Sequence, residues 1–156
     1  MTNLLIIKQT QQKTYIDEII NNSADTNIFL LEKGNYYLLN PIRIKDKKNI
    51  TIRGATGNPS DVSIIQEGTY TNTETGDVTY FDGIEITNSS HINLDSFTLS
   101  VDLNNGSPVC IVVSGSDFTN VTNCRFYGNP TNFVVYYSGP GNLPANQPTL
   151  DAYNNN

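Results

Sequence analysis

The sequence predicts an all-β domain in which short strands stack as the coils of a parallel β-helix. Hydrophobic residues make up 37% of the 156 residues and charged residues 15%, and nine Tyr and six Phe favour a folded chain over a disordered one. After Asn27, apolar and polar residues alternate between clusters of Gly, Asn, Asp and Ser, as in half-buried strands. Several of these strand segments also resemble one another at fixed offsets, which is typical of a solenoid.

The N-terminal segment is expected to form a strand and then a helix. Leu4–Ile7 is a short apolar run. Thr14 and Asp17 have the spacing of a capping box, which predicts an amphipathic helix over about 14–23. The residues expected on its apolar face are Ile16, Ile19 and Ile20. Such a helix should pack this face against the body of the domain.

The repeated unit consists of a strand, a polar corner and a second strand. The first strands are Ile42–Ile44, Ile84–Ile86 and Ile111–Val113, and the second strands are Ile50–Ile52, Ile92–Leu94 and Thr119–Val121. The second and third units are offset by 27 positions, and the first and second by 42, with the additional length in the turn-rich stretch Gly68–Asp82. Thr119 is a mismatch, because the other two units have Ile at its position.

Stacking the units about 4.8 Å apart would place equivalent residues directly above one another. Two aliphatic stacks are expected inside. One consists of Ile42, Ile84 and Ile111, and the other consists of Ile52, Leu94 and Val121. The polar ladder expected outside consists of Thr51, Asn93 and Asn120. A β-sandwich or jelly roll also has short strands at similar spacing, but it gives no reason for the fixed offsets and the recurring corner. We therefore favour the β-helix.

A single domain is predicted over residues 1–138, including the N-terminal helix, followed by a Pro- and Asn-rich extended tail over 139–156. The expected coils run over 36–65, 82–101 and 108–126, with a partial one at 133–137, which makes about three to four coils. Neither a signal peptide nor a membrane span is predicted. The expected location is a virion or the cell interior.

The distribution of charge argues against nucleic acid as a partner. The net charge is −6, and no Lys or Arg occurs between Gly54 and Cys124. Phosphate backbones are bound by clusters of Lys and Arg, which this stretch lacks. With one His and no CxxC pair, neither a metal site nor a cofactor is expected. Cys110 and Cys124 lie in apolar strand-like runs and are interpreted as two buried free thiols.

Four segments carry a resemblance to a known superfamily, namely Phe29–Tyr36, Pro41–Ile44, Asn49–Gly54 and Asn120–Gly128. They resemble right-handed parallel β-helix proteins of the pectin-lyase-like superfamily, and the resemblance spans roughly residues 14–138. It implies a right-handed coil with an amphipathic helix over its first turn, in a short member of the viral, tailspike-like structural kind. The superfamily also includes polysaccharide lyases and glycosidases, so the fold does not by itself choose a function.

The acidic residues indicate whether the chain could share the chemistry of the enzymes in this superfamily. Lyases of this type bind acidic sugars through calcium held by Asp and use a basic residue as the base, whereas the glycosidases use clustered Asp residues. The catalytic candidates are Asp82, Asp95 and Asp102. Their spacing implies no tight pair, and Arg53 and Arg125 are expected to point to solvent. We therefore predict no catalytic residue, and His91 is interpreted as a surface residue. If the chain were an enzyme, the resemblance implies a polysaccharide lyase or a glycoside hydrolase.

The predicted function is that of a non-enzymatic structural or assembly module, in a virion as a minor capsid, cement or spike protein. Its expected partners are copies of itself or other virion proteins, and the insertion Thr69–Asp82 is the expected contact loop. The residues expected to contact a partner are Tyr70, Tyr80, Phe133, Tyr136 and Tyr137. The alternative is a carbohydrate-active or carbohydrate-binding β-helix, or the N-terminal part of one. The residues that would then stack on a glycan are Tyr36, Tyr37, Tyr70, Tyr80, Tyr136 or Tyr137.

Overall fold

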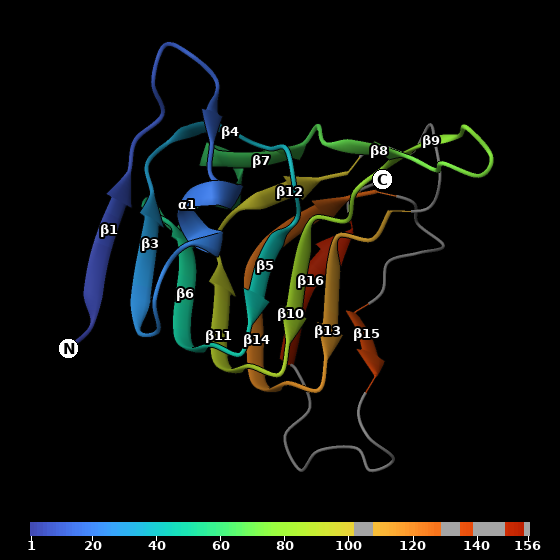
Figure 1. Cartoon of the computed structure of the whole chain (residues 1–156). Coiled ribbons are helices and arrows are strands. Elements are labelled where there is room, and N and C mark those ends of the chain that lie inside the picture. The colour runs from blue at the N-terminus through green and yellow to red at the C-terminus, as the bar shows by residue number, and fades with distance from the viewer. Residues whose placement is uncertain (102–107, 129–134, 139–148, 155–156) are drawn as a thin grey trace.

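The computed structural model describes residues 1–101 and 108–128 in full, and the backbone of residues 135–138 and 149–154. Strands dominate it, and most of them run parallel to their neighbours. The larger sheet is strongly curled, so that it has the form of a half-barrel (Figure 1). The fold is therefore all-β with mostly parallel strands, as the sequence predicts.

Two parallel sheets and one antiparallel hairpin contain the strands. The larger sheet contains β1 (Asn3–Ile7), β2 (Thr14–Tyr15), β3 (Asn27–Leu31), β4 (Gly34–Leu38), β6 (Lys48–Gly54), β7 (Val62–Gln66), β11 (Ser90–Asp95), β12 (Thr98–Ser100), β14 (Asp117–Tyr127) and β16 (Thr149–Asn154). The four-stranded sheet contains β5 (Ile42–Lys45), β10 (Ile84–Thr87), β13 (Ile111–Ser114) and β15 (Val135–Ser138). The hairpin consists of β8 (Thr69–Thr71) and β9 (Val78–Tyr80), and the helical elements are α1 (Asp17–Asn21) and the 3-10 turn η1 (Pro59–Asp61).

The larger sheet has the order β1–β3–β6–β11–β14–β12–β7–β4–β2, with β16 also paired to β14. The long strand β14 pairs with β11 through its first half and with β12 through its second half. It thereby connects two ladders of parallel strands within one curled sheet. The smaller sheet, in the order β15–β13–β10–β5, forms a third ladder (Figure 1).

The register of the strands confirms the two offsets found in the sequence. In the smaller sheet Ile84 is paired with Ile42 and Ile111. In the larger sheet Leu94 is paired with Ile52 and Val121. The six side chains of these two stacks are at most 3% exposed, so both stacks lie in the core. On the outer face, the amide of Asn120 donates to the side-chain oxygen of Asn93 at 3.0 Å, as expected of the polar ladder.

The mismatched residue Thr119 takes the place of an isoleucine in the core. It is paired with Ile92 and is fully buried. Its hydroxyl has no hydrogen-bond partner among the described residues. A buried hydroxyl without a partner weakens a fold, because it loses its bonds to water and gains none in exchange. Nothing in the structure explains why a threonine stands here.

The polar corners repeat their backbone conformation as well as their composition. Asp46, Asn88 and Gly115 occupy equivalent positions, and their φ angles are 54°, 48° and 58°. This left-handed region is the one that Gly, Asn and Asp tolerate best. Between neighbouring corners, the backbone amide of Ser89 donates to the hydroxyl of Ser116 at 3.0 Å. The corners thus satisfy one another's backbone groups, which explains their polar composition.

Two further strands extend the ladder of second strands, whose repeat is visible in the sequence only from residue 50 onward. β3 pairs with β6, and β1 pairs with β3. The inward stack of Ile52 therefore continues through Phe29 to Leu5 at the edge of the sheet. The offsets of these strands differ from 27 and 42, because the segments that connect them are shorter.

The predicted capping box is wrong, and the helix is shorter than expected. Thr14 lies in β2, which pairs with β4, and α1 begins only at Asp17. The carboxylate of Asp17 accepts instead from the backbone amides of Leu39 and Asn40, at 3.2 and 3.1 Å. Asp17 therefore holds the segment after β4 in place, and Thr14 and Tyr15 belong to a strand and not to the helix.

The apolar face of the helix is confirmed in part. Ile16 and Ile20 are buried, whereas Ile19 is 43% exposed. Ile16 precedes the helix as its N-cap, so the helix itself contains only Ile19 and Ile20, which lie about 100° apart around its axis. Among the described residues, no helix is long enough and apolar enough to span a membrane.

Candidate functional site

A depression of about 410 Å³ lies where the hairpin meets the four-stranded sheet. One side is aromatic and is formed by Tyr70, Tyr80 and Phe81. The other is polar and is formed by Arg43, Asp82 and Glu85. Thr79, Pro108 and Val109 complete the lining. We call this depression the hairpin groove.

The aromatic side of the groove is held by the hairpin. The backbone amide of Phe81 donates to the carbonyl of Gly68 at 3.0 Å, which closes the base of the hairpin. At its tip, the side chain of Asn72 accepts from the amide of Glu74 at 2.9 Å, a local turn that Asn favours. Tyr70 is 47% exposed, and the centre of its ring lies 5.2 Å from that of Phe81. The hairpin therefore presents an accessible aromatic surface.

The polar side of the groove follows from the strand register. Arg43 and Glu85 are directly paired in β5 and β10, and their side chains form an ion pair with an N–O distance of 3.0 Å. Both groups remain partly exposed, so the pair itself adds little to stability. Sequence analysis missed this pair, although the two residues are 42 positions apart, which is the offset between the first two units.

Asp82 has a structural partner within the groove. Its carboxylate accepts from the backbone amide of Val109 at 2.6 Å, and its carbonyl accepts from the side chain of Gln66 at 2.7 Å. These bonds hold the segment before β13 against the base of the hairpin. The carboxylate is thus already engaged by a backbone donor.

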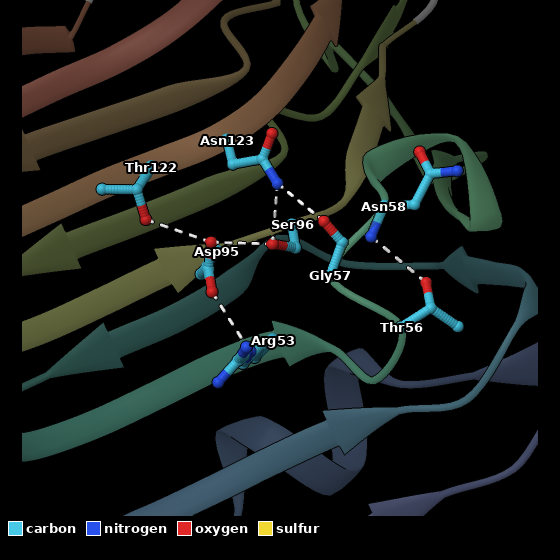
Figure 2. Close-up of polar contacts among 8 residues, drawn as sticks. All are labelled: Arg53, Thr56, Gly57, Asn58, Asp95, Ser96, Thr122 and Asn123. Carbon is cyan, nitrogen blue, oxygen red and sulfur yellow. Dashed lines mark hydrogen bonds and ion pairs between the residues drawn. The ribbon is translucent and has the colours of Figure 1, made fainter.

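Asp95 lies elsewhere, at the corner between the two ladders of the larger sheet (Figure 2). One of its oxygens lies 3.2 Å from the guanidinium of Arg53. The other accepts from the hydroxyls of Ser96 and Thr122, at 2.8 and 3.1 Å. Figure 2 shows these partners around Asp95: Arg53 and Thr122 come from β6 and β14, the strands on either side of β11, and Ser96 directly follows Asp95. Asp95 therefore links adjacent strands, and each of its carboxylate oxygens has a partner.

The same corner contains an asparagine that fixes the turn before η1. The side chain of Asn123 donates to the carbonyl of Gly57 at 2.8 Å and to the hydroxyl of Ser96 at 3.0 Å (Figure 2). Asn123 and Ser96 occupy equivalent positions with an offset of 27, and both have positive φ. This cluster consequently joins neighbouring units of the stack by hydrogen bonds and has a structural role.

The structure brings together three of the residues singled out in the sequence, namely Tyr70, Tyr80 and Asp82. Asp95 is not part of their site. Asp102 and Phe133 lie outside the described residues. Tyr136 and Tyr137 belong to β15, of which only the backbone is described, and they are paired with Val112 and Val113.

Two of the tyrosines proposed to stack on glycans have other contacts. Tyr36 is fully buried, and its single O–H donor lies within hydrogen-bond distance of two carbonyl oxygens, that of Ile7 at 2.9 Å and that of Glu32 at 2.7 Å. Burial raises the pKa of Tyr36 to about 12. The ring of Tyr37 carries the Lys13 ammonium, 4.7 Å from its centre. The prediction is therefore wrong for Tyr36, whose ring no glycan can reach.

The remaining candidates for chemistry behave as structural residues. His91 is exposed, as predicted, and its ring stacks on Phe118 at 4.6 Å. Cys110 and Cys124 are buried free thiols, also as predicted, and burial raises the pKa of each to about 12. Such thiols are poor nucleophiles, because they stay protonated at neutral pH. In the described part of the chain, no three His, Cys, Asp or Glu side chains gather as a metal site would require.

Comparison of the chain with models of protein families, with curated proteins and with solved structures finds no match.

Proposed function

We propose that the chain is a short right-handed parallel β-helix of the pectin-lyase-like kind that serves as a non-enzymatic assembly module. Its path supports the coiled fold, since three successive passes, β3–β4–β5, β6–β7–β10 and β11–β12–β13, cross the three ladders in the same order. The helix α1 precedes these passes and packs beside β5, where a cap over the first coil is expected. Three to four coils follow from this proposal.

A non-enzymatic role is supported by the contacts of Asp82 and Asp95, the two candidate carboxylates that lie within the described residues. Asp95 has three side-chain partners at its corner, and Asp82 accepts from a backbone amide in the hairpin groove. The two carboxylates belong to different regions of the surface. General acid and base groups must both reach one substrate bond, so this arrangement does not suit glycoside cleavage.

The observation that carries the assembly role is the open edge of β1. This strand ends the larger sheet, and no described strand pairs with its outer side (Figure 1). Leu4 and Ile6 are 60% and 53% exposed on its outer face. Residues 1–7 contain neither a Pro nor a charged side chain, the usual means of blocking an edge. An apolar, unblocked edge is suited to pairing with a strand of another subunit.

Replacing Ile6 by lysine is expected to release the chain from its assembly. A lysine on an edge strand opposes strand pairing, and the fold should tolerate it because the side chain is half exposed. Native mass spectrometry should find the wild-type chain in a complex with copies of itself or with other subunits. The variant should appear at the single-chain mass of 17.2 kDa.

Ile19→Lys is the matched control, because Ile19 is 43% exposed but lies on α1, outside both β1 and the insertion Thr69–Asp82. It should keep the complex. A wild-type chain that is always found alone, or an Ile6→Lys variant that keeps the complex, would contradict the assembly role. A virion as the setting, with capsid, cement or spike subunits as partners, stays a prediction.

Glycan binding in the hairpin groove is a second candidate function. The exposed Tyr70 ring faces a groove that also contains the Arg43–Glu85 pair, and glycans are bound by such combinations of aromatic and charged groups. Tyr70→Ala should weaken binding to a glycan array about tenfold, as the loss of an aromatic anchor does. Wild-type protein that binds no glycan on the array would exclude this function.

A further inference from the structure

The backbone of β1 directs specific groups toward the open edge. The amide of Asn3 donates to the carbonyl of Thr26, and the carbonyl of Ile7 accepts from the amide of Glu32. Odd-numbered residues of β1 therefore direct their backbone groups toward β3. Because alternate residues of a strand point their backbone groups to opposite sides, Leu4 and Ile6 direct theirs outward. The open edge thus offers two donors and two acceptors in a fixed order.

The fold covers a comparable edge elsewhere. In the smaller sheet, the edge strand β5 is bordered by α1. The side chain of Asn21 donates to the carbonyl of Pro41 at 3.0 Å and accepts from the amide of Arg43 at 2.7 Å. Asn21 thereby occupies the backbone groups that a further strand would use. No described element does the same for β1.

The edge of β1 is complementary to itself. If two β1 strands run antiparallel with Leu5 opposite its own copy, Leu4 of each strand lies opposite Ile6 of the other. These are the residues whose backbone groups point outward, so each such pair can exchange two hydrogen bonds. Their exposed apolar side chains then meet on the same outer face.

Charge does not oppose this contact, although each chain carries −6. The first charged side chains beside the strand are Lys8 and Glu32, and they neutralise each other in an ion pair at 3.8 Å. The two β1 strands that would pair are therefore both free of charged side chains. Like-charge repulsion between the two bodies acts over a longer distance and is screened by salt.

We propose that two copies of the chain pair through β1 about a two-fold axis at Leu5, so that the larger sheet continues from one subunit into the other. This inference rests on the proposed assembly role and names the partner as a second copy. The two-fold symmetry closes the contact, which explains how an open sheet edge can lead to a dimer and not to a fibre.

A disulfide across the axis tests the proposed geometry. Leu5 and its copy form a non-hydrogen-bonded pair with Cα atoms about 4.5 Å apart, within the range that a disulfide spans. Leu5→Cys should therefore form a covalent dimer under mild oxidation, seen as a complete shift to twice the chain mass on a non-reducing gel. Cys110 and Cys124 are buried and should not compete. Leu5 is 36% exposed, so the reduced variant should keep the circular dichroism of the wild type.

Asn3→Cys is the matched control on the same strand. Asn3 and its copy would be offset by four positions, about 13 Å along the strands, which no disulfide spans. This variant should stay a single chain, and adding Ile6→Lys to Leu5→Cys should abolish the covalent dimer. A Leu5→Cys variant that stays unlinked, or an Asn3→Cys variant that links equally well, would overturn the two-fold pairing. If Ile6→Lys still dissolves a complex in that case, the assembly role stands with another partner.

Discussion

Replacing Gly54 by alanine is expected to destabilise the fold by about 3 kcal/mol or more. Gly54 ends β6, and a Cβ at this position would lie 2.0 Å from the backbone carbonyl oxygen of Ser96. Ser96 occupies the position equivalent to Gly54 in the next unit of the stack. The backbone itself would have to move, so two neighbouring units would be forced apart. Urea denaturation followed by circular dichroism measures the loss.

Gly57→Ala is the control for Gly54→Ala, because it tests the loss of glycine's conformational freedom without a steric clash. Gly57 has a φ of +74°, and a Cβ there would meet no atom within 4 Å. Its replacement should reduce the free energy of unfolding by only about 1–2 kcal/mol, the cost of a left-handed alanine. A Gly54→Ala variant as stable as Gly57→Ala would show that the corners are less tightly stacked than the structure has them.

Replacing Leu94 by alanine is expected to reduce the free energy of unfolding by about 2–5 kcal/mol. The Leu94 side chain is fully buried between Ile52 and Val121 in the inward stack. Removing it opens a cavity in the middle of the stack, where the strands on both sides limit the collapse. Chemical denaturation by urea gives the change directly.

Asn93→Ala is the matched control on the same strand. Asn93 faces outward and is half-buried, and it loses only the hydrogen bond from Asn120. The expected change is about 1 kcal/mol. Because a shift of one residue exchanges the two faces of a strand, equal effects at positions 93 and 94 would contradict the register.

Much of the fold was predictable, because the repeat offset determines which residues meet. Residues 27 or 42 positions apart are strand partners, as with Ile84 and its two neighbours in the smaller sheet. The same offsets relate side chains in contact. Arg53 and Asp95 are 42 positions apart, and Asp95 and Thr122 are 27 apart. An offset found from apolar residues alone therefore also predicts polar contacts.

The helix boundaries could not be predicted, because they depend on contacts distant in the sequence. The spacing of Thr14 and Asp17 is that of a cap, but Thr14 pairs with Tyr36 in the sheet. Asp17 bonds to the backbone amides of Leu39 and Asn40, which lie beyond the next two strands of the chain. Local spacing carries no information on either contact, so the tertiary structure overrides it.

The hairpin groove was only partly predictable. The turn-rich insertion indicated a surface feature, and Tyr70 and Tyr80 were expected to contact a partner there. Their position beside Arg43 and Glu85 depends on how the hairpin folds back on the smaller sheet. The base of the hairpin is closed by the hydrogen bond from the Phe81 amide to the Gly68 carbonyl, and no sequence pattern indicates this bond.

The most direct test of the assembly role is amide hydrogen exchange along β1, measured by NMR in the assembled protein and in the Ile6→Lys single chain. The amides of Asn3, Leu5 and Ile7 face β3 and should be protected in both. In the assembled protein, the amides at positions 4 and 6 should also exchange slowly, because a strand from another subunit accepts from them. Positions 4 and 6 that exchange as fast in the assembled protein as in the single chain would contradict strand pairing at this edge.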